Sequence, residues 1–177
     1  SKDVSFGSEI NIFDAISPLD FRYYGRNEKI FRNLQPYLSE NAMIRHMAKV
    51  EAALIKTLAK KGICSKKTAG EVEKACKKVT AEEVYLEEDK LKHNVRALVN
   101  CIRDKVSDEA KPYVHFTATS HDIIATADAL RYKEFTNRVL LPELIDFEKA
   151  LIDIALREKN TLQVGRTHGQ HAVPITF

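Results

Sequence analysis

The sequence predicts an all-α fold, and three observations support this. Apolar residues recur every three or four positions through most of the chain, which is the period of an amphipathic helix. Helix-capping residues separate the periodic stretches, and no glycine occurs between residues 122 and 160. We therefore expect an N-terminal helical domain over residues 1–117, followed over residues 118–177 by the beginning of a central bundle of long helices.

The first helix is expected to begin near Asn41. Its apolar stripe consists of Met43, Met47, Val50, Leu54 and Leu58. Gly62 is expected to end this helix, because glycine readily adopts the left-handed conformation of a C-terminal cap.

Shorter helices follow. The first apolar stripe follows Thr68 and consists of Val72, Ala75, Cys76 and Val79. A later stripe consists of Val95, Leu98, Val99, Ile102 and Val106. Thr80 followed by Glu83 is a capping-box pattern that opens another helix between them. Pro112 then breaks the periodicity, and residues 113–116 are expected to form a short extended segment.

The last predicted helix, over residues 122–160, is the longest. At 1.5 Å per residue it would exceed roughly 50 Å, although Pro142 is expected to kink or interrupt it. A helix of that length needs other helices or subunits to cover its apolar positions, and few precede it here. We therefore expect the chain to be a fragment of a longer protein whose bundle is incomplete in residues 118–177.

Composition indicates a soluble, cytoplasmic protein. Hydrophobic residues make up 44% of the chain and charged residues 30%, which is ordinary for globular domains. No apolar run reaches the roughly 18 to 20 residues of a membrane span, and residues 1–10 lack the pattern of a signal peptide. Cys64, Cys76 and Cys101 are scattered and odd in number, so we interpret them as reduced packing residues.

The net charge of +3 is weak support for an anionic partner. Lysines cluster over residues 60–78, but no aromatic residue lies between Lys56 and Val84. Because nucleic-acid binders usually interleave aromatic and basic side chains, a solvated helix face is the better interpretation and no nucleic-acid partner is expected.

The densest chemistry lies in residues 165–172, Gly-Arg-Thr-His-Gly-Gln-His-Ala. Glycines allow a backbone to approach a ligand, and an imidazole can exchange a proton near neutral pH. The stretch therefore favours a site, with a histidine-capped turn as the alternative. His168 and His171 could also bind a metal, but without a nearby acidic or cysteine ligand this is the least favoured interpretation.

Three weaker candidate segments precede it. Residues 117–122 place hydroxyls before the long helix, where free N–H groups and the helix dipole favour an anion, although such residues are also ordinary caps. Residues 92–94 bring together a cation, a titratable ring and an amide. Residues 20–26 place arginines beside tyrosines, a combination that could hold a phosphate.

Taken in order, these segments resemble the fumarase and aspartase superfamily, and within it the adenylosuccinate lyase family. The resemblance starts at Ser17-Pro18-Leu19-Asp20, continues through the other segments, and spans nearly the whole chain after residue 17. It implies elimination of fumarate from adenylosuccinate to give AMP, and from the succinylcarboxamide ribotide SAICAR to give AICAR, in purine biosynthesis. It implies no metal and no organic cofactor, and a homotetramer whose active sites are shared between subunits.

The resemblance also implies a role for each candidate. Arg22 and Tyr23 would contact the nucleotide phosphate. Lys92, His93 and Asn94 would line the substrate, with His93 sharing the catalytic role. Thr119 and Ser120 would hold the succinyl carboxylates. His168, aided by Thr167, would protonate the departing nitrogen.

Two departures from the family pattern stand out. Asn94 occupies a position where aspartate is more frequent, so a carboxylate beside His93 is missing. The family's proton-abstracting serine lies on a loop beyond residue 177, so we expect the fragment to be inactive alone. The alternatives are a related superfamily lyase, a carboxymuconate cycloisomerase, or a non-catalytic helical interaction module; the ending Pro174-Ile175-Thr176-Phe177 also fits the cycloisomerase.

Overall fold

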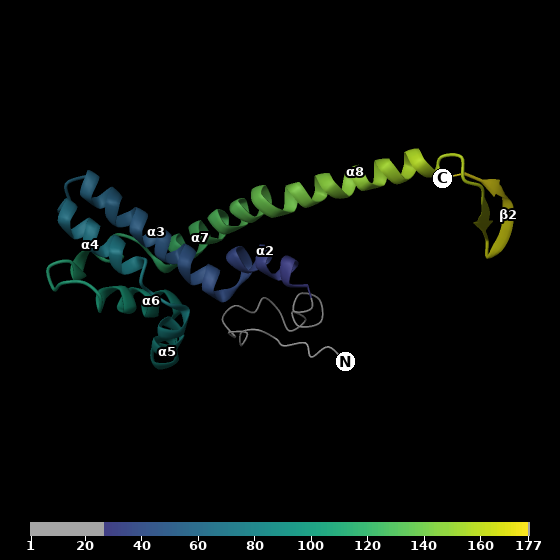
Figure 1. Cartoon of the computed structure of the whole chain (residues 1–177). Helices are drawn as coiled ribbons and strands as arrows, with labels where there is room; N and C mark the ends of the chain where they lie inside the picture. The colour runs from purple at the N-terminus through teal and green to yellow at the C-terminus, as the bar shows by residue number, and fades with distance from the viewer. Residues whose placement is uncertain (1–26, 177) are drawn as a thin grey trace, which may run out of the picture. The chain divides into compact units, whose positions relative to one another are not determined.

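The computed structural model describes residues 27–176, and helices dominate it, as the sequence predicts (Figure 1). The chain divides into two compact units between Phe135 and Thr136. The expected domain boundary between residues 117 and 118 stays a prediction.

The described part of the first unit contains helices of three to 21 residues. They are α2 (Glu28–Leu38), α3 (Glu40–Lys60), α4 (Lys66–Cys76), α5 (Ala81–Leu91), α6 (Asn94–Arg103), the 3-10 helix η2 (Lys111–Tyr113) and α7 (Ser120–Phe135). Helix α2 is not among the helices predicted from the sequence. Its start has a readable signal, because the side chain of Asn27 accepts a hydrogen bond from the Ile30 N–H at 3.2 Å.

Local capping positions most of these helices. Thr80 Oγ1 accepts from the Glu83 N–H at 3.3 Å, and Glu83 Oε1 accepts from the Thr80 N–H at 2.8 Å, which confirms the predicted capping box. Gly62 has a φ of +74° just after α3, so the predicted left-handed stop is also confirmed.

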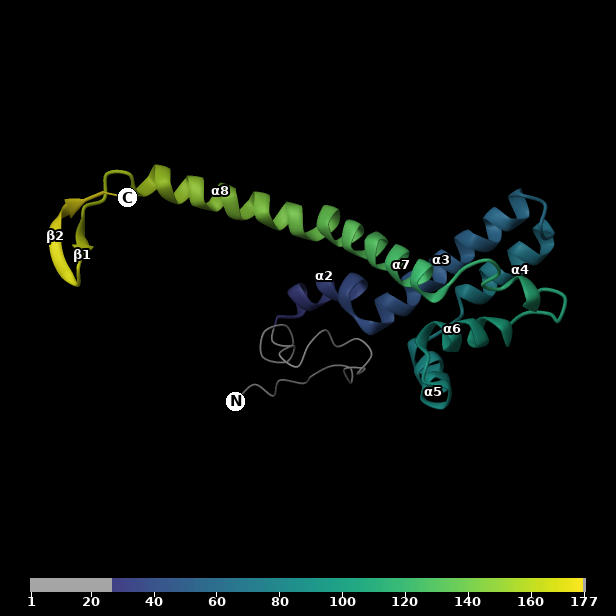
Figure 2. The ribbon, with the colours of Figure 1, turned by 180° about the vertical axis from the view of Figure 1, so that it is seen from behind.

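Helix α3 lies at the centre of the first unit. It packs against α4 and α7, while α5 packs against α6 (Figures 1 and 2). The largest fully buried apolar side chains come from α3, α6 and α7: Met47, Ile55, Leu98, Ile102 and Ile123. Burial of these residues removes apolar surface from water and fixes the loops that connect the helices.

The prediction of an extended segment over residues 113–116 is wrong. The chain forms the 3-10 helix Lys111–Tyr113 and then hydrogen-bonded turns, with the Phe116 N–H donating to the Tyr113 carbonyl at 3.3 Å. Pro112 sits in the first turn of η2, where its missing N–H leaves no helical hydrogen bond unmade. A proline that ends one helical pattern therefore starts another.

The second unit contains the π-helical turn η3 (Thr136–Leu140), α8 (Leu141–Glu158) and an antiparallel pair, β1 (Gln163–Thr167) and β2 (Gln170–Ile175). The expected interruption near Pro142 is confirmed as η3. Proline removes one N–H donor and crowds the carbonyl four residues earlier, and a wider turn relieves both. Every residue of α8 is incompletely buried, and exposed apolar side chains include Leu144, Phe147, Leu151, Ile152 and Leu156.

The three cysteines are free and buried, as expected of packing residues. Burial raises the pKa of Cys76 to about 12 and that of Cys101 to about 11, so both thiols are neutral and poor nucleophiles. In residues 27–176, no helix combines the length and apolar character that crossing a membrane requires.

Candidate functional site

His93 is the N-cap of α6, and this position determines its tautomer. Its Nδ1 accepts a hydrogen bond from the Arg96 N–H at 3.2 Å. Because a backbone N–H can only donate, Nδ1 carries no proton, and the proton of the neutral ring lies on Nε2. Nε2 is 3.4 Å from Ser120 Oγ, at the start of α7. The structure thus brings together two predicted site residues that are 27 positions apart in sequence.

Lys92 and Asn94 form the tight link around His93. Lys92 has a left-handed φ of 56° and ends α5, while its Nζ lies 3.6 Å from Asp89 Oδ1. Asn94 Oδ1 accepts from the neighbouring Val95 N–H at 2.7 Å. An asparagine at this position keeps the amide near the helix start without adding a negative charge beside His93.

Thr119 and Ser120 open α7. The Thr119 N–H donates to Asp122 Oδ2 at 2.9 Å, so the Asp122 carboxylate occupies one of the free amides at the helix start. Thr119 is exposed and Ser120 is half-buried. Both hydroxyls therefore remain within reach of a ligand at this end of α7.

The loop before α7 contains a histidine that the sequence analysis missed. His115 and Thr117 have left-handed φ values of 63° and 72°, which are unfavourable for residues with a Cβ. His115 Nδ1 lies 2.6 Å from Glu51 Oε1, and Glu51 is only 2% exposed on α3. This buried contact fixes the loop that presents Thr119 and Ser120. The available signal was a histidine five residues before Ser120.

Glu51 makes the first unit sensitive to pH. Burial raises the pKa of Glu51, and the hydrogen bond and charge of His115 offset this only in part. Its other oxygen, Oε2, is buried without a hydrogen-bond partner among the described residues. The folded state therefore favours the protonated carboxyl. That contribution to stability is complete below the ordinary pKa of 4.5 and is lost as the pH rises through the raised value.

Replacing Glu51 by glutamine tests this sign. The glutamine amide cannot ionise, so the variant does not lose stability through this group as the pH rises from about 5 to about 8, whereas the original protein does. The free energy of unfolding of Glu51→Gln, relative to that of the original protein, should therefore increase over this pH range. Urea unfolding at both pH values measures the difference. The exposed Glu82, replaced by glutamine, is the control. An unchanged difference for Glu51→Gln at the two pH values would contradict the expectation.

His168 lies at the tip of the β1–β2 hairpin. Thr167 pairs with Gln170, and the two loop residues His168 and Gly169 have φ values of 52° and 73°. Positive φ at both positions is typical of a type I′ turn. Thr167 Oγ1 is 2.8 Å from His168 Nδ1, and both side chains are exposed. The Thr167 hydroxyl thus contacts Nδ1 of the His168 ring, and Nε2 takes no part in this contact.

The glycines of this motif also have a structural reason. Gly165 is buried at an irregularity of the strand register, and a Cβ there would lie 2.7 Å from the Val173 carbonyl oxygen. The close approach at Gly165 is therefore to backbone of its own hairpin, where the sequence analysis expected an approach to a ligand. The expected turn is part of a hairpin with two strands.

Gly165→Ala should therefore open the hairpin, at a cost of about 1–3 kcal/mol for an overpacked site. Amide hydrogen exchange in β1 and β2 measures the loss of protection. Gly169→Asn is the matched control, because its added Cβ meets no atom within 4 Å and asparagine tolerates a positive φ. Equal protection in Gly165→Ala and the original protein would contradict this.

A family model described as a lyase matches residues 21–177. The chain belongs to this lyase family. It is 39% identical over 162 residues to an adenylosuccinate lyase from Archaeoglobus fulgidus and 38% identical over 165 residues to one from Methanocaldococcus jannaschii. Each match covers 92% of this chain but only 34% of the relative, so the chain spans about a third of these lyases.

Solved structures agree with this family. A fumarate lyase from Mesorhizobium sp. BNC1 matches with a TM-score of 0.70 and 26% identity, over 85% of this chain and 34% of that one. A 3-carboxy-cis,cis-muconate lactonizing enzyme from Pseudomonas putida matches with a TM-score of 0.74 and 25% identity, over 90% and 36%. The predicted resemblance to the fumarase and aspartase superfamily, and its helical fold, are confirmed.

In this lyase-family chain four of the predicted site residues contact one another, in two local pairs. His93 and Ser120 belong to the first unit, and Thr167 and His168 to the second. Arg22 and Tyr23 lie outside the described residues. Among residues 27–176, no group of three or more His, Cys, Asp or Glu side chains is placed so that it could hold a metal ion.

Proposed function

We propose that the chain is the amino-terminal part of an enzyme that eliminates fumarate from adenylosuccinate to give AMP, and from SAICAR to give AICAR. The observation that carries the proposal is the contact between His93 Nε2 and Ser120 Oγ, at 3.4 Å. A proton-carrying ring and a hydroxyl meet there at the start of α7. The similarity to lyases named for adenylosuccinate supports this substrate.

The elimination requires removal of a proton from carbon, stabilisation of the aci-carboxylate intermediate, and protonation of the departing nitrogen. We assign the last step to His168, with Thr167 orienting its ring. Thr119 and Ser120 hold succinyl carboxylates at the positive end of the α7 dipole. Arg22 and Tyr23 hold the nucleotide phosphate.

The remaining assigned residues surround His93. Lys92 supplies a positive charge, and Asn94 is a neutral neighbour whose amide nitrogen can donate a hydrogen bond. The Nε2 proton of His93 points to Ser120, where a succinyl carboxylate would accept it. With Nδ1 occupied by the Arg96 N–H, the ring exchanges protons with substrate only through Nε2.

The proton-abstracting base belongs, in this proposal, to a segment of the longer protein beyond residue 177. The exposed apolar side chains of α8 support assembly into a homotetramer whose active sites combine several subunits. The 177-residue chain alone is therefore expected to show no turnover. Turnover by the purified chain would contradict this division of the site.

A substrate panel tests the proposal. The full-length protein should convert adenylosuccinate and SAICAR, followed by the absorbance change of each nucleotide, and leave 3-carboxy-cis,cis-muconate unchanged. The panel also contains N-acetyl-S-(2-succino)cysteine, a thioether, because the chain is 33% identical over 154 residues to an N-acetyl-S-(2-succino)cysteine lyase from Enterococcus italicus. Turnover of that thioether without turnover of either nucleotide would overturn the substrate assignment. Turnover of none would favour a non-catalytic helical module.

A further inference from the structure

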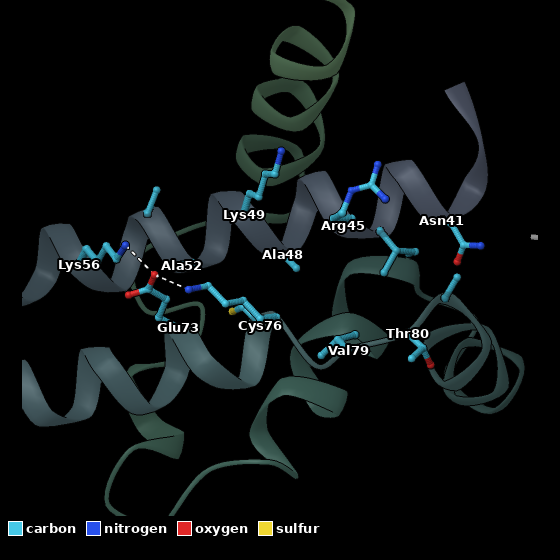
Figure 3. Close-up of a pocket in the computed structure, with 14 residues that line it drawn as sticks. Asn41, Arg45, Ala48, Lys49, Ala52, Lys56, Glu73, Cys76, Val79 and Thr80 are labelled. Atoms are coloured by element: carbon cyan, nitrogen blue, oxygen red, sulfur yellow. Dashed lines mark ion pairs between the residues drawn. The ribbon is translucent and has the colours of Figure 1, made fainter. Parts of the chain in front are cut away.

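The first unit contains a cavity of about 660 Å³ that the proposed reaction does not use. It lies along α3, between that helix, the end of α4 and the connection to α5 (Figure 3). Its volume falls in the range of small-molecule pockets, about 300–1,000 Å³. Neither His93 nor Ser120 lines it.

Small side chains on α3 create the hollow. Ala48 and Ala52 are one helical turn apart and face the cavity, with Cys76 and Val79 opposite them (Figure 3). Larger side chains at the two alanines would fill the space between α3 and α4. The floor is therefore apolar and suits a flat aromatic or aliphatic body.

Positive charge closes one end of the cavity. The ammonium groups of Lys56 and Lys77 meet on the same oxygen of Glu73, at 2.9 and 3.1 Å (Figure 3). These hydrogen bonds lower the pKa of Glu73, so its carboxylate stays ionised between two cations. Each ammonium has three N–H donors, and Glu73 engages one of each. The remaining donors and one excess positive charge are available to a second anion.

The α3 edge of the cavity adds two further cations. Arg45 donates to the carbonyl of Pro36, which is a neutral acceptor, and Lys49 Nζ lies 3.7 Å from Glu134. Figure 3 shows both of these side chains directed away from Glu73 and Cys76, so the positive charge beside the floor comes from Lys56 and Lys77, against the single carboxylate of Glu73. Such a field attracts anions and repels cations.

We propose that this cavity binds a small organic anion with an apolar body. The body lies on Ala48, Ala52 and Cys76, and the anionic group accepts hydrogen bonds from Lys56 and Lys77. Carboxylates and phosphate monoesters share this chemistry. A neutral molecule of the same shape lacks the charge-assisted hydrogen bonds and binds more weakly.

Isothermal titration calorimetry with 2-naphthoate tests the proposal on the 177-residue chain. We expect saturable binding at one site, and binding at least about tenfold weaker for the neutral 2-naphthylmethanol, since one charge-assisted hydrogen bond corresponds to about that factor. Titration with 2-naphthyl phosphate distinguishes a phosphorylated ligand from a carboxylate ligand. If it binds more tightly than 2-naphthoate, the ligand is phosphorylated; if it binds more weakly, the ligand is a carboxylate. Equal binding of the alcohol, or no saturable binding at millimolar 2-naphthoate, would overturn the proposal.

Variants locate the site. Lys77→Gln should weaken 2-naphthoate about tenfold, and Ala52→Leu should abolish binding by filling the floor. Lys60→Gln is the matched control, because Lys60 is exposed on α3 but does not line the cavity. Circular dichroism establishes whether each variant is folded. If Ala52→Leu does not fold, the result for Lys77→Gln decides the test. Unchanged binding in folded Lys77→Gln would refute the assignment of Lys77, and with it the proposal.

Discussion

His168→Ala is expected to lower kcat of the full-length enzyme for adenylosuccinate by about 10²- to 10⁴-fold, the usual contribution of a general acid. The expectation rests on the proposed function. His168 occupies a left-handed position at the hairpin tip, its side chain is exposed, and Thr167 Oγ1 lies 2.8 Å from its Nδ1. Because the ring acts on the leaving nitrogen and not on the bound ground state, KM should change little.

His171→Ala provides the control from the same hairpin. His171 is exposed on β2 and contacts Arg166 at 3.4 Å, so its removal perturbs the hairpin without removing the proposed acid. Activity should stay within about twofold of the original enzyme, as expected of a surface substitution. Near-normal turnover by His168→Ala would exclude this ring as the acid. An equal loss in both variants would instead point to disruption of the hairpin.

Local signals in the sequence predicted the parts of the fold that depend on near neighbours. Thr80 and Glu83 bond to each other across three residues, and Gly62 ends α3 through its own backbone conformation. Both can be read from a short window because no other element takes part. The missed helix α2 has a similar local signal in Asn27, but the candidate binding segment predicted before Asn41 covers only residues 20–26 and stops short of this helix.

The site depends on contacts that no short window contains. His93 and Ser120 are separated by 27 positions, and Glu51 and His115 by 64. His93 meets Ser120 because α6 packs against α7, and His115 meets Glu51 because the loop between η2 and α7 crosses near α3. The family resemblance singled out His93 and Ser120 but gave no indication of the buried carboxyl. At Gly165 the sequence was misleading in the opposite way. The functional residues around it in the chain suggested that the glycine makes room for a ligand, but the irregular strand register of the hairpin is what requires it.

Leu98→Ala is expected to destabilise the 177-residue chain by about 2–5 kcal/mol, the usual cost of deleting a buried leucine side chain. Leu98 is 0% exposed on α6, within the core that joins α6 to α3, α4 and α5. The truncation removes apolar contacts and leaves a cavity that the close-packed helices cannot fully close. Since His93 is the N-cap of α6, the same change should loosen the contact between His93 and Ser120.

Leu86→Ala on α5 is the matched control, because the same atoms are deleted from a side chain that is 61% exposed. Its effect should stay within about 0.5 kcal/mol, as for other surface substitutions. Urea unfolding followed by circular dichroism measures both variants, and an unchanged m-value indicates that the same surface is exposed on unfolding. Similar destabilisation by the two variants would mean that Leu98 does not lie in a cooperative core. The support that this core provides to His93 would then have to come from the capping hydrogen bond alone.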